Sequence, residues 1–121
     1  MPRILIVEDE PTVRNLLCAV LGSAYDCQAV RSAEEGLKLL STGAFDAAIT
    51  DVKLPGMGGA EFLRRARELD PRIPVIVVTG ADSDESKFLE AGAFGYLLKP
   101  FRVKEVEEMV RRAVGDYNTR S

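Results

Sequence analysis

The chain has 121 residues, of which 46% are hydrophobic and 29% charged, and its formal net charge is −3. These values are typical of one folded domain and exclude a disordered chain, and without a basic excess we expect no direct nucleic-acid contact. No apolar run approaches the roughly 20 residues of a membrane span and no signal peptide follows Met1, so we expect a cytoplasmic protein without membrane contact.

Short apolar runs alternate with helical patterns along the chain. Pro11 and Gly22 suit the start and the end of the first helix, and Ser32 with Glu35 forms a capping-box pattern before the second. In chain order the patterns predict strand 4–7, helix 11–21, strand 25–30, helix 32–43, strand 45–50, loop 55–59, helix 62–69, strand 75–78, helix 84–91, strand 96–98 and helix 103–114.

This alternation amounts to five βα units. Continuous apolar strands that alternate with helices are typical of a parallel sheet with helices on both faces. We therefore expect one doubly wound α/β domain over residues 1–115. Residues 116–121 are polar, and we expect them to form a C-terminal tail or the start of a linker.

Polar residues follow four of the five strands, and the carboxyl ends of parallel strands lie at one edge of a sheet. We therefore expect these side chains to lie close together. They are Glu8, Asp9, Glu10, Asp51, Thr79 and Lys99. The chain has no histidine, so a histidine-activated nucleophile and a histidine-ligated metal are both excluded.

Clustered carboxylates need a counter-charge at neutral pH. Mg²⁺ is the natural choice, because it binds one or two carboxylates together with waters and phosphate oxygens. An incoming phosphoryl group would then be held by the metal, by the ammonium of Lys99 and by the hydroxyl of Thr79. A carboxylate in such an arrangement can act as the nucleophile and become an acyl phosphate.

Each of these residues has a simpler interpretation when it is taken alone. The acidic group suits a turn before a helix, Asp51 suits a strand-end turn, Thr79 suits a helix cap and Lys99 suits a solvated surface position. Their occurrence at the same end of four different strands favours the site over these separate interpretations.

Four motifs in order resemble the receiver domain of two-component response regulators. They are VEDE at 7–10, TDVKLPGMGG at 50–59, VVTG at 77–80 and YLLKPF at 96–101. The resemblance covers the chain from Ile4 to about Val114. It implies a flavodoxin-like fold with strand order 2-1-3-4-5, and a signalling switch whose only activities are self-phosphorylation and self-dephosphorylation.

The resemblance also implies a role for each matching residue. Asp51 is identified as the phosphoacceptor, and Thr79 and Lys99 as the groups that contact the phosphoryl group. The implied Mg²⁺ ligands are Glu8, Asp9, Asp51 and the backbone carbonyl of Lys53.

The implied switch couples the acceptor site to one face of the domain. Thr79 would move toward the phosphoryl group, and Tyr96 on the next strand would rotate into the space behind it. The face formed by helix four, strand five and helix five would then change shape. Tyr96 taken alone also suits a half-buried packing residue. The resemblance further implies a cis bond before Pro100.

Two departures from the family pattern leave questions open. The acidic pair is Glu8 and Asp9, where many members have two aspartates, and the longer side chain is expected to alter metal affinity without abolishing it. Lys53 and Ala81 flank the expected path of the hydrolytic water. Ala81 leaves room there, whereas Lys53 either leans over the phosphoryl oxygens or pairs with Glu8, so the rate of self-dephosphorylation is left open.

The implied partners are a sensor histidine kinase or a histidine phosphotransfer protein, with a downstream output domain or effector protein. The chain is either a complete regulator or the receiver part of a longer one, and homodimerisation through helix four, strand five and helix five is compatible with the family. The sequence names neither the kinase nor the output.

Three other functions fit the sequence less well. Phosphatases that form an aspartyl phosphate typically carry a D-x-D motif after the first strand. Here Asp51 follows the third strand, and Lys53 stands where that motif has its second aspartate. A nucleotide or flavin binder is disfavoured because the chain has neither a GK[ST] P-loop nor a G-x-G-x-x-G after a strand. A receiver-like module that only binds proteins would not form an acyl phosphate, and the complete set of acceptor-site residues disfavours it.

Overall fold

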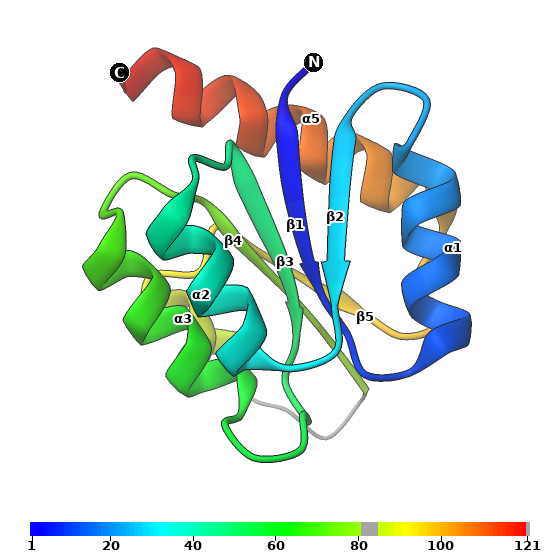
Figure 1. Ribbon diagram of the computed structural model, residues 1–121. Helices are drawn as coiled ribbons and strands as arrows, with labels where there is room; N and C mark the ends of the chain where they lie inside the picture. The colour runs from blue at the N-terminus through cyan, green and yellow to red at the C-terminus, as the bar shows by residue number, and fades with distance from the viewer. Residues whose placement is uncertain (81–84, 121) are drawn as a thin grey trace.

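The computed structural model describes residues 1–80 and 85–120, which fold into a parallel sheet between two layers of helices (Figure 1). The strands are ordered β2-β1-β3-β4-β5, so the expected fold class and strand order are confirmed. The strands are β1 (Arg3–Val7), β2 (Asp26–Val30), β3 (Ala47–Asp51), β4 (Val75–Thr79) and β5 (Gly95–Leu98). The helices are α1 (Pro11–Leu21), α2 (Ala33–Thr42), α3 (Gly59–Leu69), α4 (Glu85–Glu90) and α5 (Val103–Arg120).

The local start and stop signals act as the sequence predicted in the first half of the chain. Pro11 opens α1, and Gly22 caps it. The Ser32 side chain caps α2 by accepting a hydrogen bond from the backbone N–H of Glu35, at 3.1 Å. The helix α3 starts at Gly59, earlier than its apolar pattern suggested, because its first turn carries no large apolar side chain before Phe62. Asp84, where the fourth helix was expected to start, lies outside the described residues.

The last helix is longer than expected. Residues 116–120, which were expected to form a tail or a linker, continue α5. Tyr117 supports this extension: its hydroxyl donates a hydrogen bond to Asp70 at 3.1 Å and accepts one from Arg72 at 3.1 Å. The apolar pattern ends near Val114, so sequence periodicity could not reveal a helical segment that is held by polar contacts. No helix in the described part of the chain is long and apolar enough to cross a membrane.

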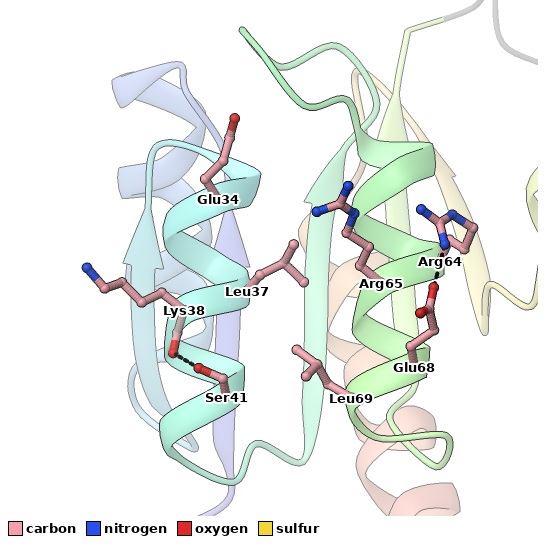
Figure 2. A pocket seen from close by; sticks show the side chains of 8 residues that line it. All are labelled: Glu34, Leu37, Lys38, Ser41, Arg64, Arg65, Glu68 and Leu69. Atoms are coloured by element: carbon pink, nitrogen blue, oxygen red, sulfur yellow. Dashed lines mark hydrogen bonds and ion pairs between the residues drawn. The ribbon is translucent and has the colours of Figure 1, made fainter.

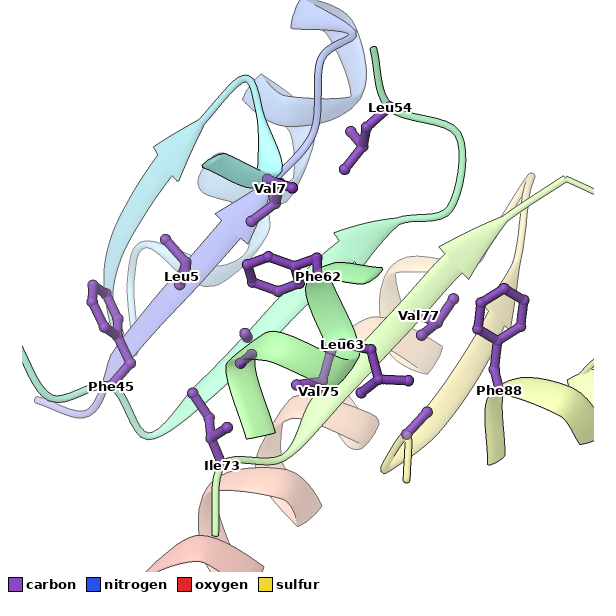
Figure 3. Close-up of a cluster of buried hydrophobic side chains, with 14 residues drawn as sticks. Leu5, Val7, Phe45, Leu54, Phe62, Leu63, Ile73, Val75, Val77 and Phe88 are labelled. Carbon is purple, nitrogen blue, oxygen red and sulfur yellow. The ribbon is translucent and has the colours of Figure 1, made fainter. Parts of the chain in front are cut away.

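Two hydrophobic clusters cover the two faces of the sheet. One cluster packs α2, α3 and α4 on the sheet around Phe62, and Figure 3 shows this side chain beside Leu5 and Val7 of β1. The other cluster packs α1 and α5 on the opposite face, through Leu17 and Val110 among others. All five residues of β3 and of β4 are buried. The central strands therefore form a rigid base for the residues that follow them.

One close approach fixes the start of α3 against the end of β3. The backbone N–H of Gly59 donates to the carbonyl of Val52 at 2.9 Å, and a Cβ at Gly59 would collide with the carbonyl oxygen of Asp51 and lie 2.8 Å from the Cα of Val52. Only glycine fits a contact of this kind between two backbones.

Gly59→Ala is therefore expected to lower the free energy of unfolding by about 1–3 kcal/mol, because the backbone must shift to accept the methyl group. Gly115→Ala is the control: nothing lies within 4 Å of a Cβ there, and alanine favours the helix by about 0.5–1 kcal/mol. Urea unfolding of both variants measures the difference. A Gly59→Ala protein as stable as the wild type would contradict the close approach.

Candidate functional site

Three carboxylates meet at the carboxyl edge of the sheet. Glu8 and Asp9 follow β1, and Asp51 ends β3, its neighbour in the sheet, where Val7 pairs with Thr50. One oxygen from each of the three carboxylates lies within 4.8 Å of the others. The expectation that the strand ends would bring these side chains together is therefore met in the structure.

Lys99 connects two of these carboxylates. Its Nζ lies 3.1 Å from Oε1 of Glu8 and 3.0 Å from Oδ2 of Asp51. The Glu8 side chain is only 2% exposed and that of Asp51 11%, whereas the Lys99 side chain is 25% exposed. The ammonium therefore bridges two nearly buried carboxyl groups. Among the described residues, Glu8 forms its ion pair with Lys99 and not with Lys53.

The electrostatics of the site reflect this crowding. Burial raises the pKa of Glu8 to about 7, against the hydrogen bond from the backbone of Glu10, and the negative charge of Asp51 adds to the rise. Burial lowers the pKa of Lys99, but its hydrogen bonds to Asp51 and Glu8 outweigh this effect and raise the pKa above its ordinary value. The ammonium is thus firmly charged, while burial disfavours the ionised form of Glu8.

Backbone groups hold the remaining oxygen of Asp51. Its Oδ1 accepts hydrogen bonds from the N–H of Val52 at 2.7 Å and of Lys53 at 3.4 Å. The carboxylate therefore has one oxygen directed to the loop that follows it and the other directed to Lys99. Such two-sided contact fixes the orientation of the group before any ligand arrives.

Arg14 is a residue of this region that sequence reasoning missed. From α1 it donates to the backbone carbonyls of Glu8 at 3.1 Å and of Asp9 at 3.4 Å. It binds main-chain oxygens and leaves the carboxylates free of a second cation. Its spacing of five and six residues from the acidic pair is a weak signal, because a solvated helix face has the same appearance in a sequence.

The donor set fits a hard divalent cation. Three carboxylates and one ammonium leave two excess negative charges if all the acids are ionised. All three acidic side chains offer oxygen ligands, which Mg²⁺ and Ca²⁺ prefer. Asp9 is more exposed than Glu8. Lys53, whose carbonyl was expected as a further ligand, lies two residues after Asp51 in the loop at the same edge.

The other predicted residues lie on the neighbouring strands. Thr79 ends β4, is 1% exposed, and its carbonyl accepts a hydrogen bond from the N–H of Lys99 at 2.8 Å. Tyr96 is half-buried on β5, with its ring centroid 6.2 Å from that of Phe88 in α4. The peptide bond between Lys99 and Pro100 is cis. Ala81 lies outside the described residues.

A groove of about 910 Å³ lies between α2 and α3, away from the acidic cluster (Figure 2). Leu37 and Leu69 lie on facing sides of it, and Glu34 lies at one end. None of the predicted site residues lines this groove. Its size does not make it the candidate site, because it contains no group that the strand-end chemistry requires.

Comparison with known proteins agrees with this geometry. Residues 4–111 match the family model described as the response regulator receiver domain. The chain is 36% identical over 121 residues to the uncharacterized transcriptional regulatory protein YkoG of Bacillus subtilis, covering 98% of this chain and 53% of that protein. It is 36% identical to the DNA-binding transcriptional regulator NtrC of Klebsiella pneumoniae, covering 93% of this chain and 24% of that protein.

A solved structure is similar over its whole length. The CheY-like response regulator receiver domain protein from Methanospirillum hungatei superposes with a TM-score of 0.93 at 33% identity, covering 100% of this chain and 99% of that one. The chain spans about half the length of the Bacillus relative and about a quarter of the Klebsiella relative.

Lys99→Ala is expected to fold but to lose about 1–3 kcal/mol of unfolding free energy in metal-free buffer, because Glu8 stays buried without its cation. The loss should be smaller at pH 5 than above pH 7, since protonated Glu8 needs no cation and ionised Glu8 does, whereas the contact of Lys99 with Asp51 is lost at both pH values. Urea unfolding in EDTA at pH 5 and pH 8.5 measures this, with Lys104→Ala on the exposed start of α5 as the control. An equal loss at both pH values would contradict the account.

Proposed function

The chain belongs to the response regulator receiver domain family, a family of signalling switches, and from this premise we propose that it accepts a phosphoryl group on Asp51. The observation that carries the proposal is the contact of Asp51 with Lys99 beside the other two carboxylates. A lone strand-end aspartate would need none of these neighbours. An acceptor whose incoming ligand is an anion needs both the ammonium and the means to bind a cation.

The donor is a phosphohistidine of another protein, since this chain has no histidine. A carboxylate oxygen of Asp51 attacks phosphorus, the P–N bond to the donor imidazole breaks, and its electron pair stays on the imidazole nitrogen, which takes a proton from solvent. Before the transfer, Oδ2 of Asp51 accepts a hydrogen bond from Lys99. As the new bond forms, the Lys99 ammonium moves to a phosphoryl oxygen. Attack of water on the acyl phosphate returns the free carboxylate.

The chain's own groups prepare the acceptor for this step. Glu8, Asp9, Asp51 and the backbone carbonyl of Lys53 would hold Mg²⁺, with Glu8 acting directly or through water. When bound, the ion supplies charge neutralisation of the carboxylates and of the incoming phosphoryl oxygens. The backbone N–H groups of Val52 and Lys53 keep Asp51 oriented, and Thr79 lies at the end of the adjacent strand.

The switch proposed here connects Thr79 to Tyr96. Val77 pairs with Tyr96 and Thr79 with Leu98, so the side chains of Thr79 and Tyr96 lie on the same face of the sheet. Movement of Thr79 toward a phosphoryl group would open room on the face where Tyr96 packs against Phe88. The surface formed by α4, β5 and α5 would then change shape, as one state of a two-state equilibrium.

The partners follow from the same proposal. We expect a sensor histidine kinase or a histidine phosphotransfer protein as the donor, and an output domain or effector protein as the receiver of the signal. The NtrC relative is a DNA-binding transcriptional regulator, which supports a transcriptional output for a longer protein that contains this domain. A cytoplasmic location and a homodimer through α4, β5 and α5 belong to the same proposal.

Incubation with acetyl phosphate and Mg²⁺ is expected to add one phosphoryl group of about 80 Da to the wild type, which intact-mass spectrometry detects. The gain should disappear without Mg²⁺ and in Asp51→Asn, because the amide is a poor nucleophile. Asp26→Asn, at an exposed position on β2, is the matched control and should gain the mass normally. No gain in the wild type, with no binding of beryllofluoride, would favour a module that binds proteins without phosphorylation.

Lys99→Ala is also expected to separate phosphorylation from the conformational change. The variant keeps Asp51 and so can still be modified, but it lacks the ammonium that follows the phosphoryl group. Amide chemical shifts of residues 95–110, recorded with and without beryllofluoride and Mg²⁺, should change in the wild type and in Lys104→Ala and change little in Lys99→Ala. A Lys99→Ala protein that responds like the wild type would remove Lys99 from the mechanism.

A further inference from the structure

Glu34, in the first turn of α2, contacts the loop that leads away from Asp51. Its Oε2 accepts a hydrogen bond from the backbone N–H of Met57 at 3.4 Å, although the two residues are 23 positions apart. Gly56 lies against the same carboxylate, where a Cβ would be 3.0 Å from Oε2, and its φ is +76°. Glycine tolerates both the positive φ and the close carboxylate. The loop backbone is therefore fitted to this one side chain.

The loop at residues 52–58 is held at its two ends by hydrogen bonds to its backbone. At its start, the carboxylate of Asp51 accepts hydrogen bonds from Val52 and Lys53. At its end, the N–H of Gly59 donates to the carbonyl of Val52 at 2.9 Å. Glu34 supplies the hydrogen bond that ties the middle of the loop to another element.

One side of the loop packs against the protein and the other side is exposed. Leu54 is buried in the cluster around Phe62, and Met57 packs against the same cluster. Lys53, next to Leu54, is exposed. With Leu54 buried and Met57 partly buried on one side, the hydrogen bond that Met57 donates to Glu34 connects the loop to α2. We infer that this contact helps to hold the backbone of Lys53 in place relative to Asp51.

We propose that Glu34 is a positioning residue for the phosphoacceptor site, which holds the loop at residues 52–58 so that the Lys53 carbonyl stays available to a Mg²⁺ bound beside Asp51. The proposal rests on the proposed function. Glu34 itself does not reach the ion. It acts through Met57 and Gly56, and because it belongs to neither the acidic cluster nor the Lys99 ion pairs, its loss is expected to leave those groups in place.

The matched variants are Glu34→Ala, Glu34→Gln and Glu35→Ala. Glutamine keeps an oxygen that accepts the hydrogen bond of Met57 but loses the negative charge. Glu35 lies in the same turn, is also exposed, and contacts the Ser32 cap rather than the loop. Its removal therefore reports the effects of charge and of helix capping alone.

The first measurement is the dissociation constant of Mg²⁺, by titration calorimetry on each protein. The second is amide hydrogen exchange of residues 53–58 without metal, which is independent of any activity. Glu34→Ala is expected to bind Mg²⁺ about 2–10-fold more weakly than the wild type, the loss that corresponds to one hydrogen bond, and to exchange faster in the loop. Glu34→Gln and Glu35→Ala should stay close to the wild type in both measurements.

Two results would overturn the proposal. Glu34→Ala with unchanged Mg²⁺ affinity would show that the loop is placed without this side chain, and an equal weakening in all three variants would reduce Glu34 to a distant charge. A wild type that binds no Mg²⁺ would contradict the proposed function instead. In that case, unchanged amide exchange of the loop in Glu34→Ala would also contradict the role of Glu34 in holding the loop. Faster exchange would confirm that role.

Discussion

The site depends on one constraint, which is that two carboxylates at the end of the central strands are nearly buried and share a single ammonium. Asp51 ends β3 and Glu8 directly follows β1, and both side chains are removed from water because these two strands are covered on both faces. An uncompensated charge at such a position is costly, so Lys99 must be present and charged. The one ammonium cannot neutralise both acids together with Asp9, and this imbalance is the electrostatic basis of the proposed cation site.

The fold could be predicted from the periodicity of the apolar residues, and most of the site from the positions of polar residues at the strand ends. Apolar runs such as 4–7 and 75–78 become buried strands since their neighbours are helices, and strand ends in a parallel sheet coincide by topology alone. Lys99 could be assigned to the acidic edge for the same reason. That it pairs with Glu8 as well as Asp51 could not, because Lys53 was an equally plausible partner in a sequence without coordinates.

The features that the sequence did not reveal are held by polar contacts between distant residues. The last turns of α5 continue because Tyr117 reaches Asp70 and Arg72, and nothing in the periodicity of the helix reports such a contact. Arg14 and Glu34 act on backbone carbonyls and N–H groups, which every residue possesses, so their partners leave no signature in the side-chain pattern. Charged residues on helix faces look alike until the main chain beside them is known.

The same geometry explains why the acceptor edge is suited to transmit a change. Lys99 is the first residue after β5, and its N–H is bonded to the carbonyl of Thr79, so the ammonium and the hydroxyl are attached to backbones that are hydrogen-bonded to each other. Three residues before Lys99 on the same strand lies Tyr96, which contacts Phe88 of α4. In the proposed switch, a ligand that draws Lys99 and Thr79 toward Asp51 would therefore act on the strand that also carries Tyr96. The strands β3 and β4 are buried on both faces whereas β5 is only partly buried, so in the switch proposed above β5 and the adjacent α4 are the elements expected to move.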